Sequence, residues 1–382
     1  MPAFHQIGHN SENLLFEDEL SRYGGAILSP LNYGPDAVAN QIARLRPREN
    51  FVTVFDPHLY RPQSERMCLP EWDYYPRDVD STDFNDAWWA EIVDRVAHTA
   101  VVLGTSAVAS PAIVPRVFSD DFFLHLIANG NRLESALRTT PVRSMQTIIV
   151  NLADLATIPR VMTIASIVSR SRADECLLVF LGDVEPRREL ANPEEVKGAM
   201  RLISTLELGG QRVTVASSGA EMILWKGAGA TNCATGKFFN LRRFTISRFD
   251  EPDGGGGGQL GYWFEEALLA FLRQSDLLRV RDRGIISAAS QANPVVASIL
   301  QAIPLNEPWV GRGWRQFLYW FADAEFRLSN GAVSALDLIR TADANWAAIE
   351  RGAPPLFMEE RQNDGSWVRQ WLRAVVEFPY FI

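Results

Sequence analysis

The feature that most constrains the fold is a strand-like apolar run followed by a helix-like segment, repeated about eight times along the first three quarters of the 382-residue chain. Four of the runs are 51–55, 146–150, 176–181 and 213–216, and 51–55 is continuous and β-branched. A continuous apolar run bounded by polar residues or chain-breakers is typical of a strand buried on both faces of a parallel sheet. The alternation therefore predicts an α/β fold with right-handed crossovers between parallel strands.

Eight strand–helix units close most naturally into a (β/α)₈ barrel, although the same alternation also allows an open doubly wound α/β sheet. Neither a GxGxxG sequence after a strand nor a GxxxxGK[ST] sequence occurs, so nothing favours a dinucleotide-binding fold or a P-loop. At the level of the fold the chain resembles the (β/α)₈ (TIM) barrel superfamily. This resemblance implies an active site at the carboxyl ends of the strands and a phosphate site near the last two of them.

The chain divides into three parts on this interpretation. Residues 1–22 are expected to form a loosely attached N-terminal arm, 23–300 the α/β barrel domain and 301–382 a helical C-terminal subdomain. A third strand is expected at 99–103, a strong helix at 261–272 and a last weak strand at 277–280 or 285–286. Clearer helices are expected at 35–45, 86–98, 119–138 and, starting from the capping residue Asn192, up to the glycines at 209–210.

The C-terminal part is unusually rich in tryptophan. Six of the eleven tryptophans lie in it, on three segments with helical spacing of aromatic residues: Trp309, Trp314, Trp320, Trp346, Trp367 and Trp371. We interpret these aromatic faces mainly as core that packs against the barrel. The alternative is a contact surface for a protein partner, because tryptophan and arginine are enriched at interfaces.

Charge and cysteine content exclude several classes of protein. The net charge of −9 disfavours sequence-independent binding to nucleic acid, which needs a broad positive surface. Three widely separated cysteines predict a reducing compartment, and the absence of CxxC and HExxH patterns gives no reason to expect structural zinc. No apolar stretch has the length of a transmembrane helix or a signal-peptide core. We therefore expect a cytoplasmic protein without a membrane partner.

Acidic residues and a histidine follow several predicted strands. Because these strand ends meet at one mouth of a barrel, the catalytic candidates are Asp56, His58, Asp154 and Asp183. Such groups can supply an acid–base pair or bind a divalent metal ion, which leaves the cofactor unknown. The alternative is that each aspartate only caps the following helix. Histidine is a poorer cap, so the Asp56–His58 pair is the better candidate.

A second group of candidates lies in and after the predicted sixth and seventh strands. In TIM barrels a phosphate site commonly sits at the loops after strands seven and eight. The candidate substrate- or anion-binding residues are Ser217, Ser218, Asn232, Lys237, Arg242 and Arg243. Arginine binds phosphate through two parallel hydrogen bonds and lysine as a point charge. If Arg242 and Arg243 lie in a strand, only one of them can face the mouth. The alternative is a solvated basic stretch paired with the nearby acids Glu251 and Asp253.

Four further features permit two interpretations each. Lys226 can act as a Schiff-base or general-base lysine if it is buried, and Cys233 is either a nucleophile near Lys237 or, more simply, an inert core residue. The long polar segment 60–84 suggests a lid or binding loop, and the glycines at 254–258 a hinge or mobile lid.

Two functional hypotheses follow. The first is an enzyme of TIM-barrel type, a transferase or hydrolase, that acts on a phosphate-bearing or nucleotide-like small molecule by acid–base or metal-assisted chemistry. The second is a non-catalytic barrel-derived subunit that docks into a protein complex through its aromatic C-terminal helices.

Overall fold

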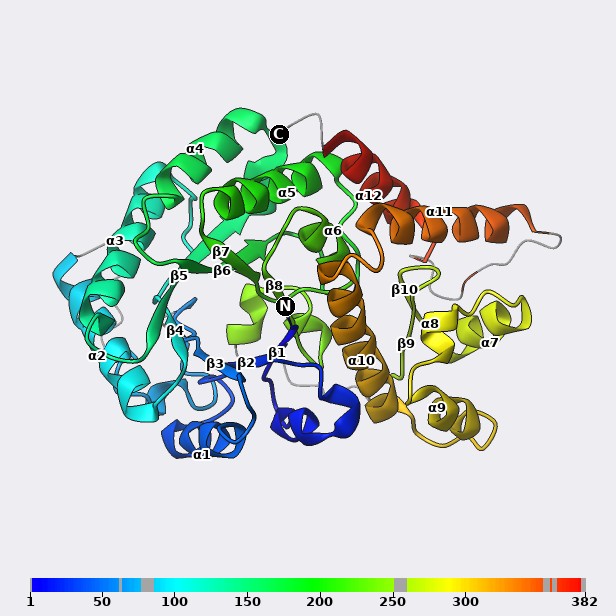
Figure 1. Cartoon of the computed structure of the whole chain (residues 1–382), viewed down its shortest axis with the longest axis horizontal. Coiled ribbons are helices and arrows are strands. Elements are labelled where there is room, and N and C mark those ends of the chain that lie inside the picture. The colour runs from blue at the N-terminus through cyan, green and yellow to red at the C-terminus, as the bar shows by residue number, and fades with distance from the viewer. Residues whose placement is uncertain are drawn as a thin grey trace.

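The computed structural model describes residues 2–61, 64–76, 86–250, 260–352, 358 and 363–378. Its centre is a closed barrel of eight parallel strands, which confirms the (β/α)₈ prediction over the open sheet (Figure 1). The strands are β1 (Phe4–Gln6), β2 (Gly25–Leu28), β3 (Val52–Phe55), β4 (Ala107–Ala109), β5 (Arg143–Asn151), β6 (Glu175–Leu181), β7 (Arg212–Val215) and β8 (Asn232–Thr235). The first and last strands close the ring, with Phe4 opposite both Gly25 of β2 and Ala234 of β8.

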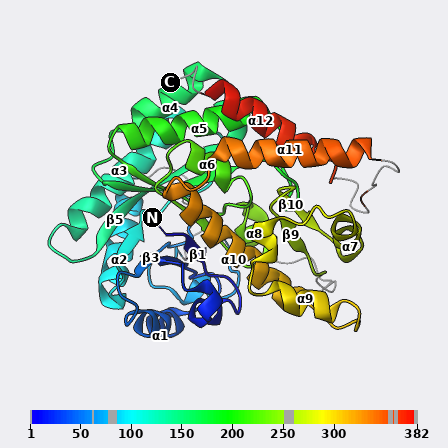
Figure 2. The same cartoon turned by 45° about the vertical axis from the view of Figure 1, so that its right-hand side comes forward.

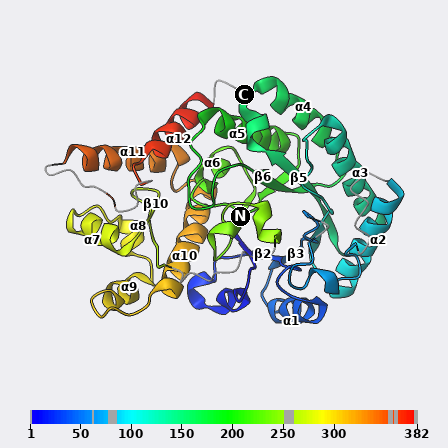
Figure 3. The same cartoon turned by 180° about the vertical axis from the view of Figure 1, so that it is seen from behind.

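Helices surround the barrel and connect most of the strands (Figures 1 and 3). These are α1 (Pro35–Leu45), α2 (Asp86–Leu103), α3 (Asp120–Leu137), α4 (Ile158–Val168), α5 (Pro193–Leu208) and α6 (Met222–Gly227). The β1–β2 connection contains only two 3₁₀ turns, η1 (Glu12–Phe16) and η2 (Asp18–Leu20). Side-chain caps fix two helix starts. Asn192 accepts from the Glu194 amide at 3.1 Å, as the sequence predicts, and Ser119 accepts from the Phe122 amide at 3.2 Å.

Two assignments in the first third of the chain are wrong. The predicted N-terminal arm contains β1, a buried barrel strand that is only three residues long. Residues 99–103 continue helix α2 instead of forming a strand, and the solvent-facing Val101 and Val102 explain how an apolar run can end a surface helix. The strand expected there is β4 (Ala107–Ala109), which lies further along the chain and is too short to show a periodic pattern.

The segment after the barrel begins with strands rather than the predicted helix at 261–272. An antiparallel hairpin, β9 (Trp263–Glu265) and β10 (Ala270–Leu272), is followed by α7 (Gln274–Asp282), α8 (Ala288–Gln291), α9 (Val296–Ala302), α10 (Val310–Ser329), α11 (Ala335–Arg351) and α12 (Ser366–Glu377). The weak strand expected at 277–280 is therefore part of α7. The glycines at 254–258 lie outside the described residues, as does part of the 60–84 loop.

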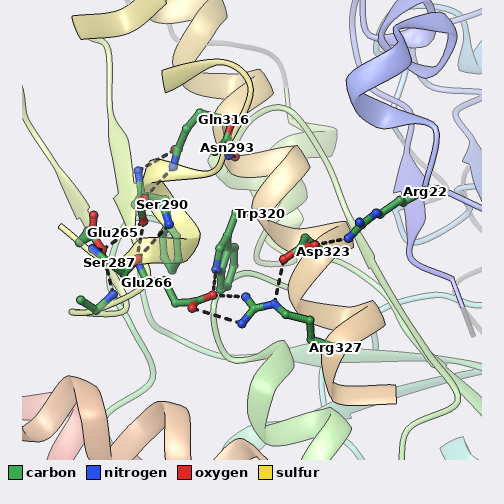
Figure 4. A network of polar contacts seen from close by, with 12 residues as sticks. Arg22, Glu265, Glu266, Ser287, Ser290, Asn293, Gln316, Trp320, Asp323 and Arg327 are labelled. Atoms are coloured by element: carbon green, nitrogen blue, oxygen red, sulfur yellow. Dashed lines mark hydrogen bonds and ion pairs between the residues drawn. The ribbon is translucent and has the colours of Figure 1, made fainter. Parts of the chain in front are cut away.

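Helix α10 attaches this segment to the barrel. It contacts η2, α6 and β8, and so occupies the part of the helical ring that the β1–β2 connection leaves without a helix (Figures 1 and 2). A chain of charged contacts reinforces the attachment (Figure 4). Arg327 pairs with Glu266 and, through Nε at 2.8 Å, with Asp323, which in turn pairs with Arg22 of the barrel. Trp320 also donates to Glu266 at 2.8 Å.

The tryptophans of the C-terminal segment face inward. Five of them are at most 6% exposed and Trp314 is partly buried. Among the described residues, no helix combines the length and the apolar character that crossing a membrane requires.

Candidate functional site

A cleft of about 670 Å³ lies at the carboxyl-terminal mouth of the barrel. Its walls come from the loops that follow β1, β2, β3, β6 and β8, and from the C-terminal segment. The lining residues that matter for its chemistry are His9, Asn32, Arg66, Glu185, Arg187, Lys237, Phe238, Phe239, Arg242, Arg248, Tyr262 and Trp314. The cleft thus lies where ligands bind in most barrels of this type. One of its walls belongs to the C-terminal segment and not to the barrel.

The cleft is strongly cationic in an acidic protein. Five of its side chains are positively charged and one, Glu185, is a carboxylate: the cations are Arg66, Arg187, Lys237, Arg242 and Arg248. Within the part of the chain that the structure describes, none of the five has a carboxylate oxygen within 4.0 Å. The positive charge of the cleft is therefore not neutralised by its own walls.

Neutral groups hold these cations in place instead. Arg242 donates from Nε to the Gly236 carbonyl at 3.1 Å and from Nη2 to the Lys237 carbonyl at 2.9 Å. Lys237 donates to the Asn10 carbonyl at 3.2 Å, and its Nζ lies 4.3 Å from the centroid of the Trp314 ring. Burial lowers the pKa of Arg242 to about 9 and that of Lys237 as well, but Arg242 still carries its charge at neutral pH.

The Asp56–His58 pair lies in the interior of the protein and does not line the cleft. Asp56 follows β3 and accepts hydrogen bonds from the His58 amide at 3.1 Å and the Tyr60 hydroxyl at 2.9 Å. Burial raises the pKa of Asp56 to about 6, although these hydrogen bonds and the charge of Arg248 oppose the shift. Burial also lowers the pKa of His58 well below its usual value, so this imidazole is neutral at physiological pH. Arg248 connects this pair to the cleft, because it lines the cleft and its charge acts on both Asp56 and His58.

Arg243 belongs to a buried cluster of three ionisable groups. Its Nη2 lies 3.5 Å from Glu189 Oε2 and 3.5 Å from Glu221 Oε2. Neither oxygen forms a hydrogen bond, and Nη1 of Arg243 also has no partner. Burial raises the pKa of Glu189; the charge of Arg243 opposes this shift and that of Glu221 adds to it. Glu189 also lines a second cavity of about 340 Å³ beside the cleft.

The two arginines that the sequence predicts at the site, Arg242 and Arg243, therefore have different environments. Arg242 faces the cleft and Arg243 does not line it, so only one of the two does so. The expected reason, alternation along a strand, is wrong. Both residues follow a 3₁₀ turn, η5 (Phe239–Leu241), beyond the end of β8.

The remaining predicted residues lie outside the cleft lining. Asp154 is half-buried on the 3₁₀ turn η4 (Leu152–Ala156), and Asp183 is exposed just after β6. Ser217 and Ser218 are buried after β7 and engaged internally, Ser217 with Gln6 at 3.0 Å and Ser218 with the Val215 carbonyl at 3.2 Å. Asn232 was expected after a strand but begins β8, at the opposite end of the barrel, because that strand is shorter and earlier than predicted.

Two other reactive-looking side chains are structural. Lys226 donates to the carbonyls of Ala230 at 2.7 Å and Thr231 at 2.9 Å, and lies 3.7 Å from the buried Glu325. Burial and the charge of Glu325 raise the pKa of the Cys233 thiol well above its usual value. This agrees with the interpretation of Cys233 as an inert core residue.

Sequence reasoning missed several lining residues. Arg187 follows β6 in the run Glu-Pro-Arg-Arg, so the strand-end rule already contained a signal for it. Arg66 lies in the loop that was interpreted as a binding loop, and Arg248 in the basic stretch after β8. Nothing in the sequence indicated Tyr262 or Trp314, which reach the cleft only because the C-terminal segment folds back over the barrel mouth.

The described residues contain no group of three or more His, Cys, Asp or Glu side chains arranged to hold a metal ion. Fold and site together define the chain as a (β/α)₈ barrel protein with a cationic cleft at its carboxyl-terminal mouth. No known protein-family model matches the chain, and no curated protein is detectably similar to it in sequence.

Proposed function

We propose that the protein is an enzyme of TIM-barrel type that binds a phosphate-bearing or nucleotide-like substrate in the mouth cleft. The observation that carries this proposal is the set of five cations without a carboxylate partner among the described residues. An unneutralised cluster of this kind costs self-repulsion in the empty protein, and an anionic ligand relieves that cost. Lys237 and Arg242 are the anchors of the anion, with Arg66, Arg187 and Arg248 around them.

The remaining lining suits a ligand with a flat or apolar portion. Phe238, Phe239, Tyr262 and Trp314 supply aromatic surface, and the volume of about 670 Å³ falls within the range typical of small-molecule sites. The cations are also already in position, because carbonyl oxygens and ring faces hold Lys237 and Arg242. Binding therefore needs little reordering of these side chains.

Acid–base chemistry falls to the carboxylates that line the two cavities: Glu185, Glu189 and Asp364. Asp154 and Asp183 are less suitable, because they line neither cavity. A transferase or a hydrolase both need such a group to move a proton at the bond that is broken. A divalent metal ion would bind together with the phosphate of the substrate, as magnesium commonly does.

A thermal-shift screen with inorganic phosphate, ribose 5-phosphate and the four 5′-mononucleotides tests this proposal. A ligand present at ~100-fold its dissociation constant adds ~2.7 kcal/mol to the stability of the native state. Arg187→Ala should reduce the shift in melting temperature, because it removes one cation of the cleft. Arg187 is exposed, so its loss does not disturb the core. The matched control is Arg138→Ala, an exposed arginine at the end of α3 on the opposite side of the barrel.

A shift that is weakened by Arg187→Ala but not by Arg138→Ala supports the anion site. If no phosphate compound raises the melting temperature of the wild type, the proposal is wrong. Incubation of the binding compounds with the protein, followed by chromatography of the products, then tests catalysis itself. Products that disappear with Glu189→Gln would indicate that this carboxyl group takes part.

The docking hypothesis gains no specific support. Its proposed contact residues, the C-terminal tryptophans, are used inside the protein: Trp346 donates to the Leu268 carbonyl at 2.8 Å and Trp371 to the Leu190 carbonyl at 2.7 Å. A partner would have to use other surface.

A further inference from the structure

Two of the five cations of the cleft form a pair beside helix α10. Arg242 donates from Nη2 to the carbonyl oxygen of Lys237 at 2.9 Å. The Nζ of Lys237 lies 4.3 Å from the centroid of the Trp314 ring, and the guanidinium carbon of Arg242 lies 3.8 Å from that of the Phe317 ring. Both rings belong to α10, so we call Lys237 and Arg242 the α10 pair.

Two other cations form a second pair at the 3₁₀ turn η6 (Ile246–Phe249). Arg248 lies on this turn and donates to Ser29 Oγ, just after β2, at 3.2 Å. Arg66 donates to the carbonyl oxygen of Arg248 and, at 2.7 Å, to that of Asp250. Burial lowers the pKa of Arg248 to about 10, and the charge of Arg66 adds to this shift. We call Arg66 and Arg248 the η6 pair.

The contacts of the two pairs place them at different parts of the cleft wall. The α10 pair packs against the C-terminal segment and the loop after β1, whereas the η6 pair packs against the residue that follows β2 and the turn itself. Within the described residues, the two pairs have no side-chain hydrogen-bond partner or aromatic ring in common. Two such binding points suit two anionic groups that are separated within one ligand.

Each pair also keeps arginine N–H groups for a ligand. Arg242 is 4% exposed and donates from Nε and Nη2, and Arg248 is 6% exposed and donates only from Nη2. Nη1 of Arg242 and both Nε and Nη1 of Arg248 have no hydrogen-bond partner among the described residues, yet none of these nitrogens is fully shielded from solvent. Because both buried side chains line the cleft, these nitrogens face it, and guanidinium groups of this kind bind phosphate.

The charge of the cleft matches two phosphate groups better than one. Five cations against the single carboxylate Glu185 leave four positive charges in excess. A phosphate monoester carries about −1.5 to −2 at pH 7, so one such group would leave at least half of this excess uncompensated. Two such groups would balance most of it, with one phosphate for the two cations of each pair.

We infer that the ligand of the cleft is a bisphosphate, a small molecule with two phosphate groups on different atoms of its carbon skeleton. One phosphate binds the α10 pair and the other binds the η6 pair. A mononucleotide, which has one phosphate, would satisfy only one of the pairs. This inference rests on the proposed function and narrows its substrate class from phosphate-bearing compounds in general to bisphosphates.

The test measures dissociation constants by calorimetry for two sugar bisphosphates and their monophosphates. The probes are fructose 1,6-bisphosphate with fructose 6-phosphate, and ribose 1,5-bisphosphate with ribose 5-phosphate. At least one bisphosphate should bind tenfold or more tightly than its own monophosphate, the effect of a further hydrogen bond to a charged group. Pyrophosphate is the control for charge, because its two phosphorus atoms share one oxygen. It should bind at least tenfold more weakly than that bisphosphate.

Two variants test the pairs separately. Arg66→Gln removes one cation of the η6 pair, and Lys237→Gln one cation of the α10 pair. Each should weaken the bisphosphate tenfold or more, whereas only one of them should weaken the monophosphate, which occupies one pair at a time. The matched control is Arg61→Gln, in the same loop as Arg66, because Arg61 pairs with Asp250 and lies outside the cleft lining. It should leave every affinity unchanged.

The outcomes separate this inference from the proposed function. If both bisphosphates bind like their monophosphates, or if pyrophosphate binds as tightly as the better bisphosphate, the two-phosphate site is refuted while the anion site stands. The same holds if Arg61→Gln and Arg66→Gln have equal effects. If no phosphate compound binds, the proposed function and this inference are both refuted. The comparison of ligands on the wild type decides even if a variant does not fold.

Discussion

The guanidinium carbon of Arg242 lies 3.8 Å from the centroid of the Phe317 ring, so a cation of the barrel mouth stacks on a helix of the C-terminal segment. The same guanidinium lies 4.9 Å from the Phe271 ring and donates to two carbonyl oxygens after β8. One planar group thus joins the barrel, the β9–β10 hairpin and α10 at the edge of the cleft.

Arg242→Lys should therefore destabilise the protein although it keeps the charge. A lysine cannot make both carbonyl hydrogen bonds in this geometry, nor stack on the Phe271 and Phe317 rings as a planar group does. We expect a loss of roughly 2–3 kcal/mol in the free energy of unfolding, measured with urea, from the lost hydrogen bonds and stacking. Arg138→Lys, at an exposed helix end, should change it by no more than ~0.5 kcal/mol. Equal effects of the two substitutions would show that the stacking contributes nothing.

Glu325 should make stability depend on pH. It is completely buried on α10, where burial raises its pKa from 4.5 to about 7 against the opposing charge of Lys226. Between these two values the folded protein holds a proton that the unfolded chain has released. The free energy of unfolding therefore falls as pH rises from 4.5 to 7, by at most ~1.4 kcal/mol per pH unit from this group.

Glu325→Gln removes this term. The difference in unfolding free energy between wild type and variant, followed by urea titration across that interval, should shift steadily in favour of the variant as pH rises. Other titrating groups are common to both proteins and cancel. A difference that stays constant with pH would mean that the carboxyl group ionises normally inside the protein.

Gly198 marks the closest approach between α5 and the turn η4. A Cβ at this position would lie 1.8 Å from the carbonyl oxygen of Leu155, a backbone atom that cannot rotate away. Gly198→Ala should cost roughly 3 kcal/mol, at the upper end of overpacking penalties. Gly311→Ala in α10 meets nothing closer than 3.9 Å and should be neutral or stabilise by up to ~1 kcal/mol through helix propensity. Thermal denaturation of both variants tests this prediction. Similar melting temperatures would contradict the predicted steric clash with the Leu155 carbonyl.

The three thiols should react unequally with a disulfide reagent. Cys68 is partly exposed, whereas Cys176 and Cys233 are buried. Burial raises the pKa of all three, so the exposed one reacts slowly at neutral pH and faster as pH rises. We expect one thiol to be titrated in the native protein and three in urea. Rapid reaction of Cys233 in the native state would revive its interpretation as an activated nucleophile.

The barrel could be predicted because its longest strands, β5 and β6, contain the apolar runs 148–150 and 176–181. Helices with side-chain caps precede β5 and follow β6. The shortest strands could not. Phe4–Gln6 contains a histidine and a glutamine, which are buried because the barrel closes around them. Ala107–Ala109 has one β-branched residue and is flanked by serines. Three residues give no periodicity, so neighbours in space decide their conformation.

The candidate site likewise has residues that could be predicted from the sequence and residues that could not. The sequence directed attention to the loop after the last strand, where Lys237 and Arg242 line the cleft. It misplaced Asn232, since a strand boundary error of a few residues moves a side chain from one mouth of the barrel to the other. It also could not reveal the walls that Tyr262 and Trp314 provide, because these depend on how a distant segment packs. The catalytic roles of Asp56, His58, Asp154 and Asp183 remain predictions.

The pairing of Phe4 with Ala234 has a consequence for synthesis of the protein. A ribosome releases β1 first, yet its second neighbour emerges only after all the other barrel strands, at 5–20 residues per second. For that interval the growing sheet has two free edges, at β1 and at the most recent strand, and each can pair with a strand of another chain. Sealing of the barrel is therefore a late event, and conditions that slow translation near β8 should increase aggregation of the nascent protein.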